Sequence, residues 1–418
     1  MKEEMNKTKS TGESQSLQRA RRGNRELLRR LHPARAGALY ALILVLITFQ
    51  FLTTRDGLPS FLSVANVNNL LDQSALDGML VVSMTVLLIT GNFDLSVGAS
   101  AGFSGAIGLT VANHAGPVVG LVAAVATGVI VGLVNGLVVQ LVGVNSFIAT
   151  LGMLTALEGA LLVATNGNTI LAGTKAGTFG GLGTASWNVN KVAVIVFGLA
   201  CLLWTAWWFI DQRKNGDAVG TPSSTIAVFI LGLTSLLIVM LVPHLLSESR
   251  ETWVMLGFMA IAALALRFTI VGRRTYAVGG SVEAARLSGI NVVRYKIVPF
   301  MLVGVTAGIA GVMYAGKFGA VDPTALTSEE LPVIAAAVLG GTSLFGGAGY
   351  VTKSVIGTLI LVSLADGFGV TNLSANYQYL VQGGVIIAAA SIYTVASKQR
   401  FSKRRSIDDV TLEVAEIS

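Results

Sequence analysis

Long apolar stretches recur along almost the whole chain, and they restrict its fold more than any other feature. A helix needs about 20 consecutive apolar residues to cross a bilayer, and the sequence offers that length many times. Only 12% of the residues are charged, against about 25% in soluble domains, and the stretches do not alternate like the strands of a membrane barrel. We therefore predict an all-α, polytopic integral membrane helical bundle. The twelve expected spans are 37–53, 74–90, 96–113, 117–141, 146–164, 192–210, 225–246, 253–271, 297–316, 331–346, 350–370 and 379–396.

The charged residues predict how this bundle is oriented. Basic residues favour the cytoplasmic side of a membrane protein, and they gather in segments 1–35, 273–296 and 398–418. Acidic breaks, such as the one at Glu251, then fall outside, where Arg55 and Lys317 are isolated basic exceptions. An even number of spans returns the chain to its starting side, so we expect both termini in the cytoplasm.

The same pattern divides the chain into three regions. We expect a basic disordered tail over 1–35, a transmembrane domain over 36–397 and a second cytoplasmic tail over 398–418. A basic tail before a first membrane helix contacts anionic lipid, so we favour membrane lipid over nucleic acid as its partner.

Two of the expected spans are interrupted. The stretch 331–346 is short, ends among glycines and can alternatively be a half-helix or a re-entrant segment, and residues 91–95 contain Gly91, Asn92 and Asp94. Loosened backbone is tolerated in a bilayer where it is buried in protein or lines a wet cavity. Each site is therefore either part of a substrate pathway or a tight turn between helices, and the sequence leaves both readings open.

Residue types that carry catalysis or bind metals are sparse. Cys201 is the only cysteine, and no His, Asp or Glu cluster has the spacing of metal ligands. Residues 311–317 approach a phosphate-binding loop, but Phe318 occupies the position where a Ser or Thr must bind Mg²⁺. We predict no catalytic residues, no metal site and no cofactor bound by this chain, which is therefore not expected to be an enzyme.

A polar stretch after the eighth expected span has the signals of a short capped helix. Ser281 is a suitable N-cap, Glu283 falls in the first turn and Arg286 near the last, and Gly289 can end the helix. A helix at this place can be gripped by a cytoplasmic partner, although a surface helix without a partner would have the same sequence.

Several motifs together resemble the permease subunits of ATP-binding-cassette (ABC) importers for monosaccharides, the family of the ribose and xylose permeases. The resemblance covers about residues 74–396 in the expected order. The stretch Glu283-Ala284-Ala285-Arg286-Leu287-Ser288-Gly289-Ile290, preceded by Gly279-Gly280, resembles the ATPase-coupling segment of that family. Three further stretches agree: Gly91-Asn92-Phe93-Asp94-Leu95-Ser96-Val97-Gly98, Asn145-Ser146-Phe147-Ile148-Ala149-Thr150-Leu151-Gly152-Met153 and Leu339-Gly340-Gly341-Thr342-Ser343-Leu344-Phe345-Gly346-Gly347.

The resemblance implies a division of labour among subunits. Two copies of the permease would form the pathway, and two cytoplasmic ABC ATPase subunits, which bind ATP and Mg²⁺, would dock on the coupling segments. An extracytoplasmic sugar-binding protein would deliver the substrate, and a bacterial inner membrane would be the location. Residues 365–367 and 377–379 favour the xylose type, whereas Asn92 and Phe93 replace the small residues often found there.

Polar residues within or beside the apolar stretches are the candidates for a substrate pathway. An unpaired charge inside a membrane costs at least about 2.5 kcal/mol, so each should face protein or a cavity. Asp94 can alternatively be the N-cap of the third span, and Asp366 can make a structural hydrogen bond. If such carboxylates instead bind a coupling ion, the chain would be an ion-coupled secondary sugar transporter. The candidates are Asn92, Asp94, Ser96, Asn135, Asn145, Thr150, Glu158, Thr342, Ser343, Asp366 and Gln378.

Overall fold

The computed structural model describes residues 33–177 and 249–371 continuously, with isolated positions between 199 and 233 and between 377 and 391. This part of the chain is almost entirely helical, which confirms the predicted all-α membrane fold. Seven of its helices are long and apolar enough to cross a membrane. They are α2 (Pro33–Arg55), α3 (Val64–Ile89), α5 (Pro117–Leu137, continued by the π-helical turn η1, Val138–Val142), α6 (Ser146–Thr165), α10 (Arg250–Phe268), α13 (Val292–Phe318) and α15 (Val351–Val370).

The remaining described elements are shorter or richer in small residues. The helices are α4 (Val97–Ala115), the 3₁₀ turn η2 (Thr174–Ala176), α11 (Ile270–Gly280), α12 (Val282–Leu287) and α14 (Glu330–Leu339). Strands β1 (Ile170–Leu171) and β2 (Ala320–Val321) form one antiparallel pair between the loops after α6 and α13.

Two expected spans have different bounds in the structure. The helix predicted over 74–90 begins at Val64, because Ser63 caps it through the Asn66 amide. The span predicted over 331–346 is the 10-residue helix α14, and Gly341, with φ +85°, lies in the turn that follows it. The spans predicted over 192–210, 225–246 and 379–396 lie outside the continuously described residues, so the count of twelve and the side of each terminus stay predictions.

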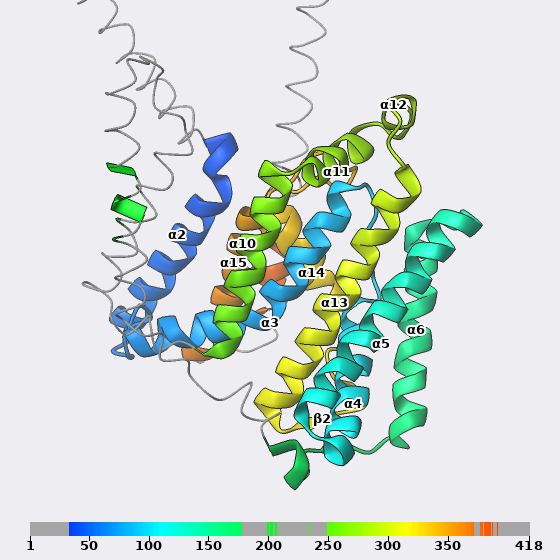
Figure 1. Ribbon diagram of the computed structural model, residues 1–418. Coiled ribbons are helices and arrows are strands. Elements are labelled where there is room, and N and C mark those ends of the chain that lie inside the picture. Colours follow the sequence, from blue (N-terminus) through cyan, green and yellow to red (C-terminus); the bar gives the residue numbers. More distant parts are fainter. Residues whose placement is uncertain are drawn as a thin grey trace, which may run out of the picture.

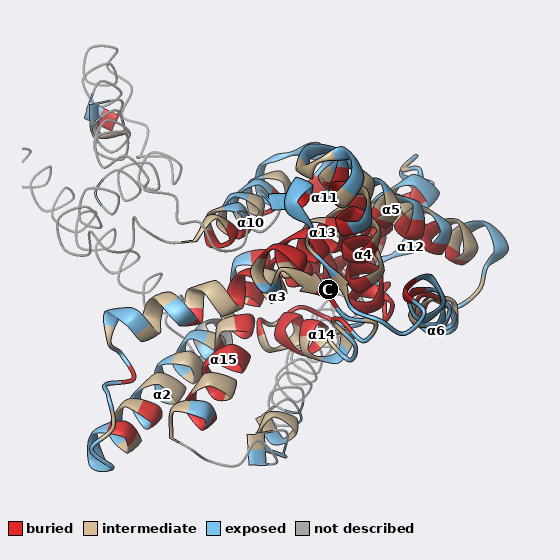
Figure 2. Cartoon of the chain, turned by 90° about the horizontal axis from the view of Figure 1, so that it is seen from below, coloured by how far each residue is buried: buried red, intermediate tan, exposed pale blue. Residues whose placement is uncertain are grey.

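The core of the bundle is the packing of α3, α4, α5 and α13 (Figure 1). Seen along the bundle, buried residues concentrate on α3, α4 and α13, while α2 and α6 show mostly exposed and intermediate positions (Figure 2). At the crossing of α5 and α13, a Cβ atom on Gly128 or on Gly304 would overlap the backbone oxygen of the other. Small residues thus let these two backbones approach closely, which is a main source of helix association in lipid.

Candidate functional site

The short helix α12 lies between α11 and α13 at the end of the bundle drawn uppermost in Figure 1, here called the α12 end. The Ser281 hydroxyl accepts a hydrogen bond from the Ala284 amide at 3.2 Å, which is an N-cap contact. Gly289, with φ +75°, ends the helix, and its amide donates to the Arg286 carbonyl at 3.0 Å. The capped helix predicted from the sequence is confirmed, with a length of six residues.

The two faces of α12 differ in exposure. Ala285 is 3% exposed and packs against Val278 of α11, so it fixes the helix to the body of the protein. Glu283 in the first turn is exposed, and Leu287 is 90% exposed. An exposed leucine next to Arg286 is available to a partner, and burying it there would contribute about 1.5–3 kcal/mol.

Three segments far apart in sequence meet beside α12 in what we call the glycine junction, defined by residues 89–91, 279–280 and 346–347. The Gly347 amide donates to the Ile89 carbonyl at 2.9 Å. A Cβ on Gly279 would overlap the Ile89 oxygen and lie 2.7 Å from the Gly347 nitrogen. A Cβ on Gly346, whose φ is +85°, would lie 2.7 Å from the Gly279 oxygen and 2.9 Å from the Gly91 nitrogen. The end of α3, the end of α11 and the loop between α14 and α15 are therefore in direct backbone contact.

A tyrosine of α11 strengthens this junction. The Tyr276 hydroxyl donates to the Gly349 carbonyl at 2.7 Å. Burial, and to a lesser extent the neighbouring Tyr350, raises the pKa of Tyr276, so the hydroxyl keeps its proton and its role as donor. In the same loop Phe345 is 93% exposed. The sequence motifs named all these segments but gave no signal that they meet, and Phe345 was not among the predicted site residues.

Four of the predicted pathway residues form one buried hydrogen-bond network where α4, α5 and α6 approach each other. Asp94, 1% exposed, accepts from the Ser96 amide at 2.8 Å and from the Ser96 hydroxyl at 2.6 Å. The Asn135 amide donates to Asp94 at 3.2 Å and to the Ser96 hydroxyl at 2.9 Å. The Thr150 hydroxyl accepts from the Leu95 amide at 3.0 Å. The carboxylate is thus held by three donors and fixes the loop between α3 and α4.

The interpretation of Asp94 as the N-cap of the third span is wrong in position. The helix begins at Val97 with Ser96 as its N-cap, and the Ser96 side chain makes no capping bond. Asp94 lies two residues before Ser96, and its carboxylate accepts a hydrogen bond from the Ser96 amide. Aspartates in turns commonly make this contact. Asn145 does cap a helix, since its side chain accepts from the Phe147 amide at 2.9 Å at the start of α6.

The other candidates from the same motifs lie near the glycine junction. Thr342 and Ser354 share a hydrogen bond of 3.1 Å between their hydroxyls, and the Ser343 hydroxyl accepts from the Phe345 amide at 3.2 Å. Asn92 is buried, and its side chain donates to the Thr90 hydroxyl at 3.3 Å. These contacts shape the two loops that form the junction.

The remaining candidates are not brought together. Asp366, near the end of α15, accepts from the Asn66 side chain at 2.8 Å, which is the structural hydrogen bond that was one of its two predicted roles. Glu158 lies half-buried on α6, and Gln378 is a half-buried position beyond the continuously described residues. The residues predicted to line one pathway therefore lie at several separate places in the protein.

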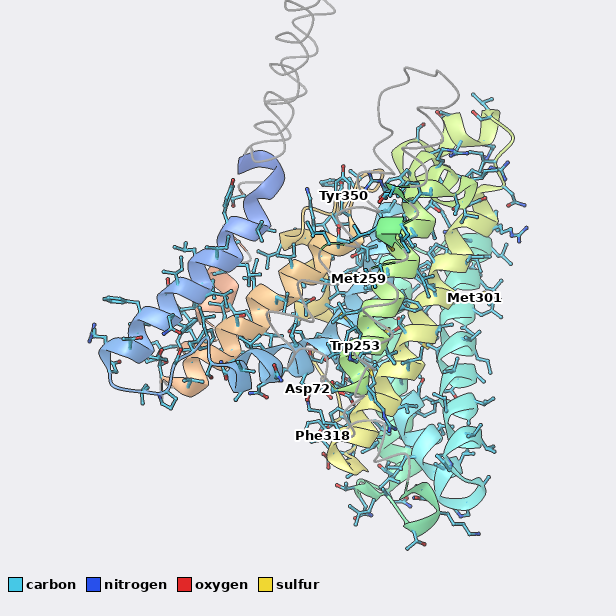
Figure 3. All side chains as sticks on the ribbon, turned by 60° about the vertical axis from the view of Figure 1, so that its left-hand side comes forward. Asp72, Trp253, Met259, Met301, Phe318 and Tyr350 are labelled. Atoms are coloured by element: carbon cyan, nitrogen blue, oxygen red, sulfur yellow. The ribbon has the colours of Figure 1, made fainter. Side chains whose placement is uncertain are left out.

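A group of charged residues that sequence reasoning did not single out lies at the end of the bundle opposite α12. Figure 3 shows Asp72, Trp253 and Phe318 near one another where α3, α10 and α13 meet. Lys317 is 3.7 Å from the Asp72 carboxylate, so this supposed isolated exception is paired. Glu251, expected in an exterior break, is 1% exposed, and neither of its carboxylate oxygens has a hydrogen-bond partner within the described residues.

Nucleotide and metal chemistry gain no support from this arrangement. Residues 311–317, which resemble a phosphate-binding loop, lie wholly inside the helix α13, whereas such a loop joins a strand to a helix. Within the described part of the chain, no three His, Cys, Asp or Glu side chains are grouped so as to hold a metal ion.

Comparison with known proteins agrees with these motifs. Residues 66–390 match the family described as the branched-chain amino acid transport system / permease component. The xylose transport system permease protein XylH of Escherichia coli K12 is 34% identical over 361 residues, 84% of this chain and 88% of XylH. The corresponding protein of Haemophilus influenzae is 35% identical over 86% of this chain and 96% of its own length.

Ribose permeases are nearly as similar. The ribose import permease protein RbsC of Bacillus subtilis is 36% identical over 333 residues, 79% of this chain and 85% of RbsC. No solved structure matches the chain. The chain belongs to this family of transport-system permease components, and the resemblance to ribose and xylose permeases that its motifs indicate is confirmed.

Proposed function

We propose that the chain is the membrane-spanning subunit of an ABC importer that moves a monosaccharide inward by alternating access. Separate ATPase subunits, which bind ATP and Mg²⁺, supply the free energy, so this chain has no enzymatic activity of its own. The observation that carries the proposal is α12, a capped helix between two long helices that buries Ala285 and exposes Leu287.

The glycine junction gives this helix a route into the bundle. A force applied by an ATPase to Leu287 or Glu283 acts on α11 and α13, which flank α12 directly. Through the backbone contacts of Gly279 with Ile89 and Gly347, the same displacement reaches α3 and the loop between α14 and α15. Backbone contacts transmit displacement well because close-packed groups cannot yield without moving their neighbours.

The substrate we propose is D-xylose or a related pentose. Two of the relatives are named as xylose permeases, and the ribose permeases are of similar identity. Uptake of labelled xylose, with unlabelled ribose and xylose as competitors, separates the two. Stronger competition by ribose than by xylose would assign the chain to ribose.

We propose further that two copies form the pathway in a bacterial inner membrane, with both termini in the cytoplasm and a sugar-binding protein on the outer side. These assignments follow from the family and from the positions of the basic segments. Crosslinking of the chain in intact membranes would test the dimer, and a single-copy complex with the ATPase would contradict it.

An ion-coupled secondary sugar transporter is the second candidate, and one observation favours it. Glu251 is a buried carboxylate without a hydrogen-bond partner among the described residues, and such groups often carry protons or cations in carriers.

Uptake experiments separate the two functions. In cells that express the chain with its ATPase, collapse of the proton and sodium gradients should leave uptake intact while ATP is maintained. Loss of uptake on collapse, together with normal uptake after deletion of the ATPase, would establish the carrier instead.

A further inference from the structure

A pocket of about 360 Å³ lies at the α12 end, between α10, α11 and α13, with Val86 of α3 among its lining residues. This volume is within the range of small-molecule sites, but its surface is nearly all carbon. A polyhydroxylated sugar would find few hydrogen-bond partners there. Among its lining residues are Ala265, Leu266, Val271, Thr275, Arg294 and Val298.

The pocket forms because the chain changes direction between α10 and α11. Thr269 ends α10 in an extended conformation, with φ −100° and ψ 162°, and caps α11 through the Gly272 amide. A Cβ on Gly272 would overlap the backbone of Leu266, so the chain can turn sharply here. In Figure 1, α11 runs across the upper ends of the long helices, and residues of α10, α11 and α13 line the pocket.

The rim of this pocket is apolar on its outer side. Phe268, Ile270, Val271 and Val298 are all at least half exposed. An exposed apolar surface of this kind beside membrane-spanning helices is suited to lipid chains. The pocket and the rim together therefore form an apolar surface at the end of the spans.

Basic residues surround the same place without acidic partners. Residues 252–282 and 292–321 contain no Asp or Glu, and none of their cations at this end forms an ion pair with any described residue. Arg294 lines the pocket itself. The basic residues of α10, α11 and α13 around the pocket are Arg267, Arg273, Arg274, Arg294 and Lys296, and the neighbouring helix α12 adds Arg286 together with one acidic residue, Glu283.

We propose that this pocket is a site for an anionic phospholipid, with an acyl chain in the pocket and the phosphate group beside Arg294. Basic pockets between membrane helices on the cytoplasmic side recognise such head groups, and the cytoplasmic leaflet is the one that the proposed orientation assigns to the α12 end. Because α11 lines the pocket and leads into α12, the lipid would steady the element that contacts the ATPase.

Native mass spectrometry of the purified full-length chain tests this site. The chain is loaded in mild detergent with dioleoyl phosphatidylglycerol or with dioleoyl phosphatidylcholine at equal concentration. We expect the wild-type chain to retain one phosphatidylglycerol under conditions that remove phosphatidylcholine. Arg294→Gln should lower the phosphatidylglycerol-bound fraction about fivefold, the equivalent of the ~1 kcal/mol that one basic residue contributes near an anionic surface.

Filling the pocket provides a second variant with a matched control. Ala265→Leu should abolish retention of phosphatidylglycerol, whereas Ala263→Leu, on the same helix but outside the pocket lining, should not. Lys175→Gln, an exposed basic residue far along the chain on η2, controls for loss of one positive charge. Equal retention of the two lipids, or equal loss in variants and controls, would overturn the proposal.

A photocrosslinker at the exposed residue Val298, in native membranes, identifies what covers the pocket. Crosslinks to phospholipid are the expected result. Crosslinks to a second copy of the chain or to another protein would overturn the lipid site. None of these readouts requires transport, so their failure leaves the importer function untouched, and failure of ATPase binding leaves the lipid result untouched.

Discussion

A methyl group at Gly279 should destabilise the protein more than one at the next residue. In the glycine junction, the Cβ of Gly279→Ala would overlap the Ile89 oxygen and lie 2.7 Å from the Gly347 nitrogen. Ordinary contacts of a Cβ begin near 3.4 Å, so the backbones must separate. Overpacking of this kind costs about 1–3 kcal/mol, and loss of the bond between Gly347 and Ile89 costs about 0.5–1.5 kcal/mol more.

The matched control is Gly280→Ala, because a Cβ there has no atom within 4 Å. Thermal unfolding in detergent measures the difference. Large domains lose about 2–4 °C per kcal/mol, so a total loss of about 1.5–4.5 kcal/mol predicts a midpoint about 3–18 °C lower for Gly279→Ala. The Gly280→Ala midpoint should match the wild type. Equal midpoints for the two variants would refute the reasoning about the junction.

Three further substitutions test the buried polar groups, each by thermal unfolding against the wild type. Asn135→Leu removes one donor from Asp94 and should cost about 1–3 kcal/mol; an unchanged midpoint would mean that the network contributes nothing. Lys317→Met should be destabilising, because it leaves the Asp72 carboxylate without its ion pair. Glu251→Gln should be neutral or stabilising, because it removes a buried carboxylate that has no hydrogen-bond partner among the described residues, and marked destabilisation would show that the carboxylate makes a stabilising interaction.

The parts of the fold that could be predicted are those determined by local sequence. Long apolar runs predicted the membrane helices. The helix α12 and its ends were predicted from Ser281, Glu283 and Gly289. The start of α3 was misplaced by ten residues because Asn and Asp occur throughout its first turns, which lowers the apolar signal. The helix predicted over 331–346 was too long, because glycine-rich sequence continues an apolar run without continuing a helix.

The site was predictable only as separate pieces. The motifs singled out the segments around Gly91, Gly279 and Gly346, but their meeting depends on contacts across more than 50 residues. Asp94 was chosen as a polar residue beside an apolar span, and nothing local indicated that Asn135 would reach it. Lys317 and Asp72 are 245 positions apart, so their pairing could not be read from either neighbourhood.

We propose that the ATPase binds the permease at α12, and the decisive experiment is to measure the affinity of the ATPase subunit for the Leu287→Ala variant. Alanine keeps the helix, and Leu287 is 90% exposed, so the isolated chain should stay folded. We expect the affinity to be at least about tenfold weaker, equivalent to ~1.4 kcal/mol, with a similar loss for Glu283→Arg. Wild-type affinity in both variants, at unchanged thermal stability, would contradict it.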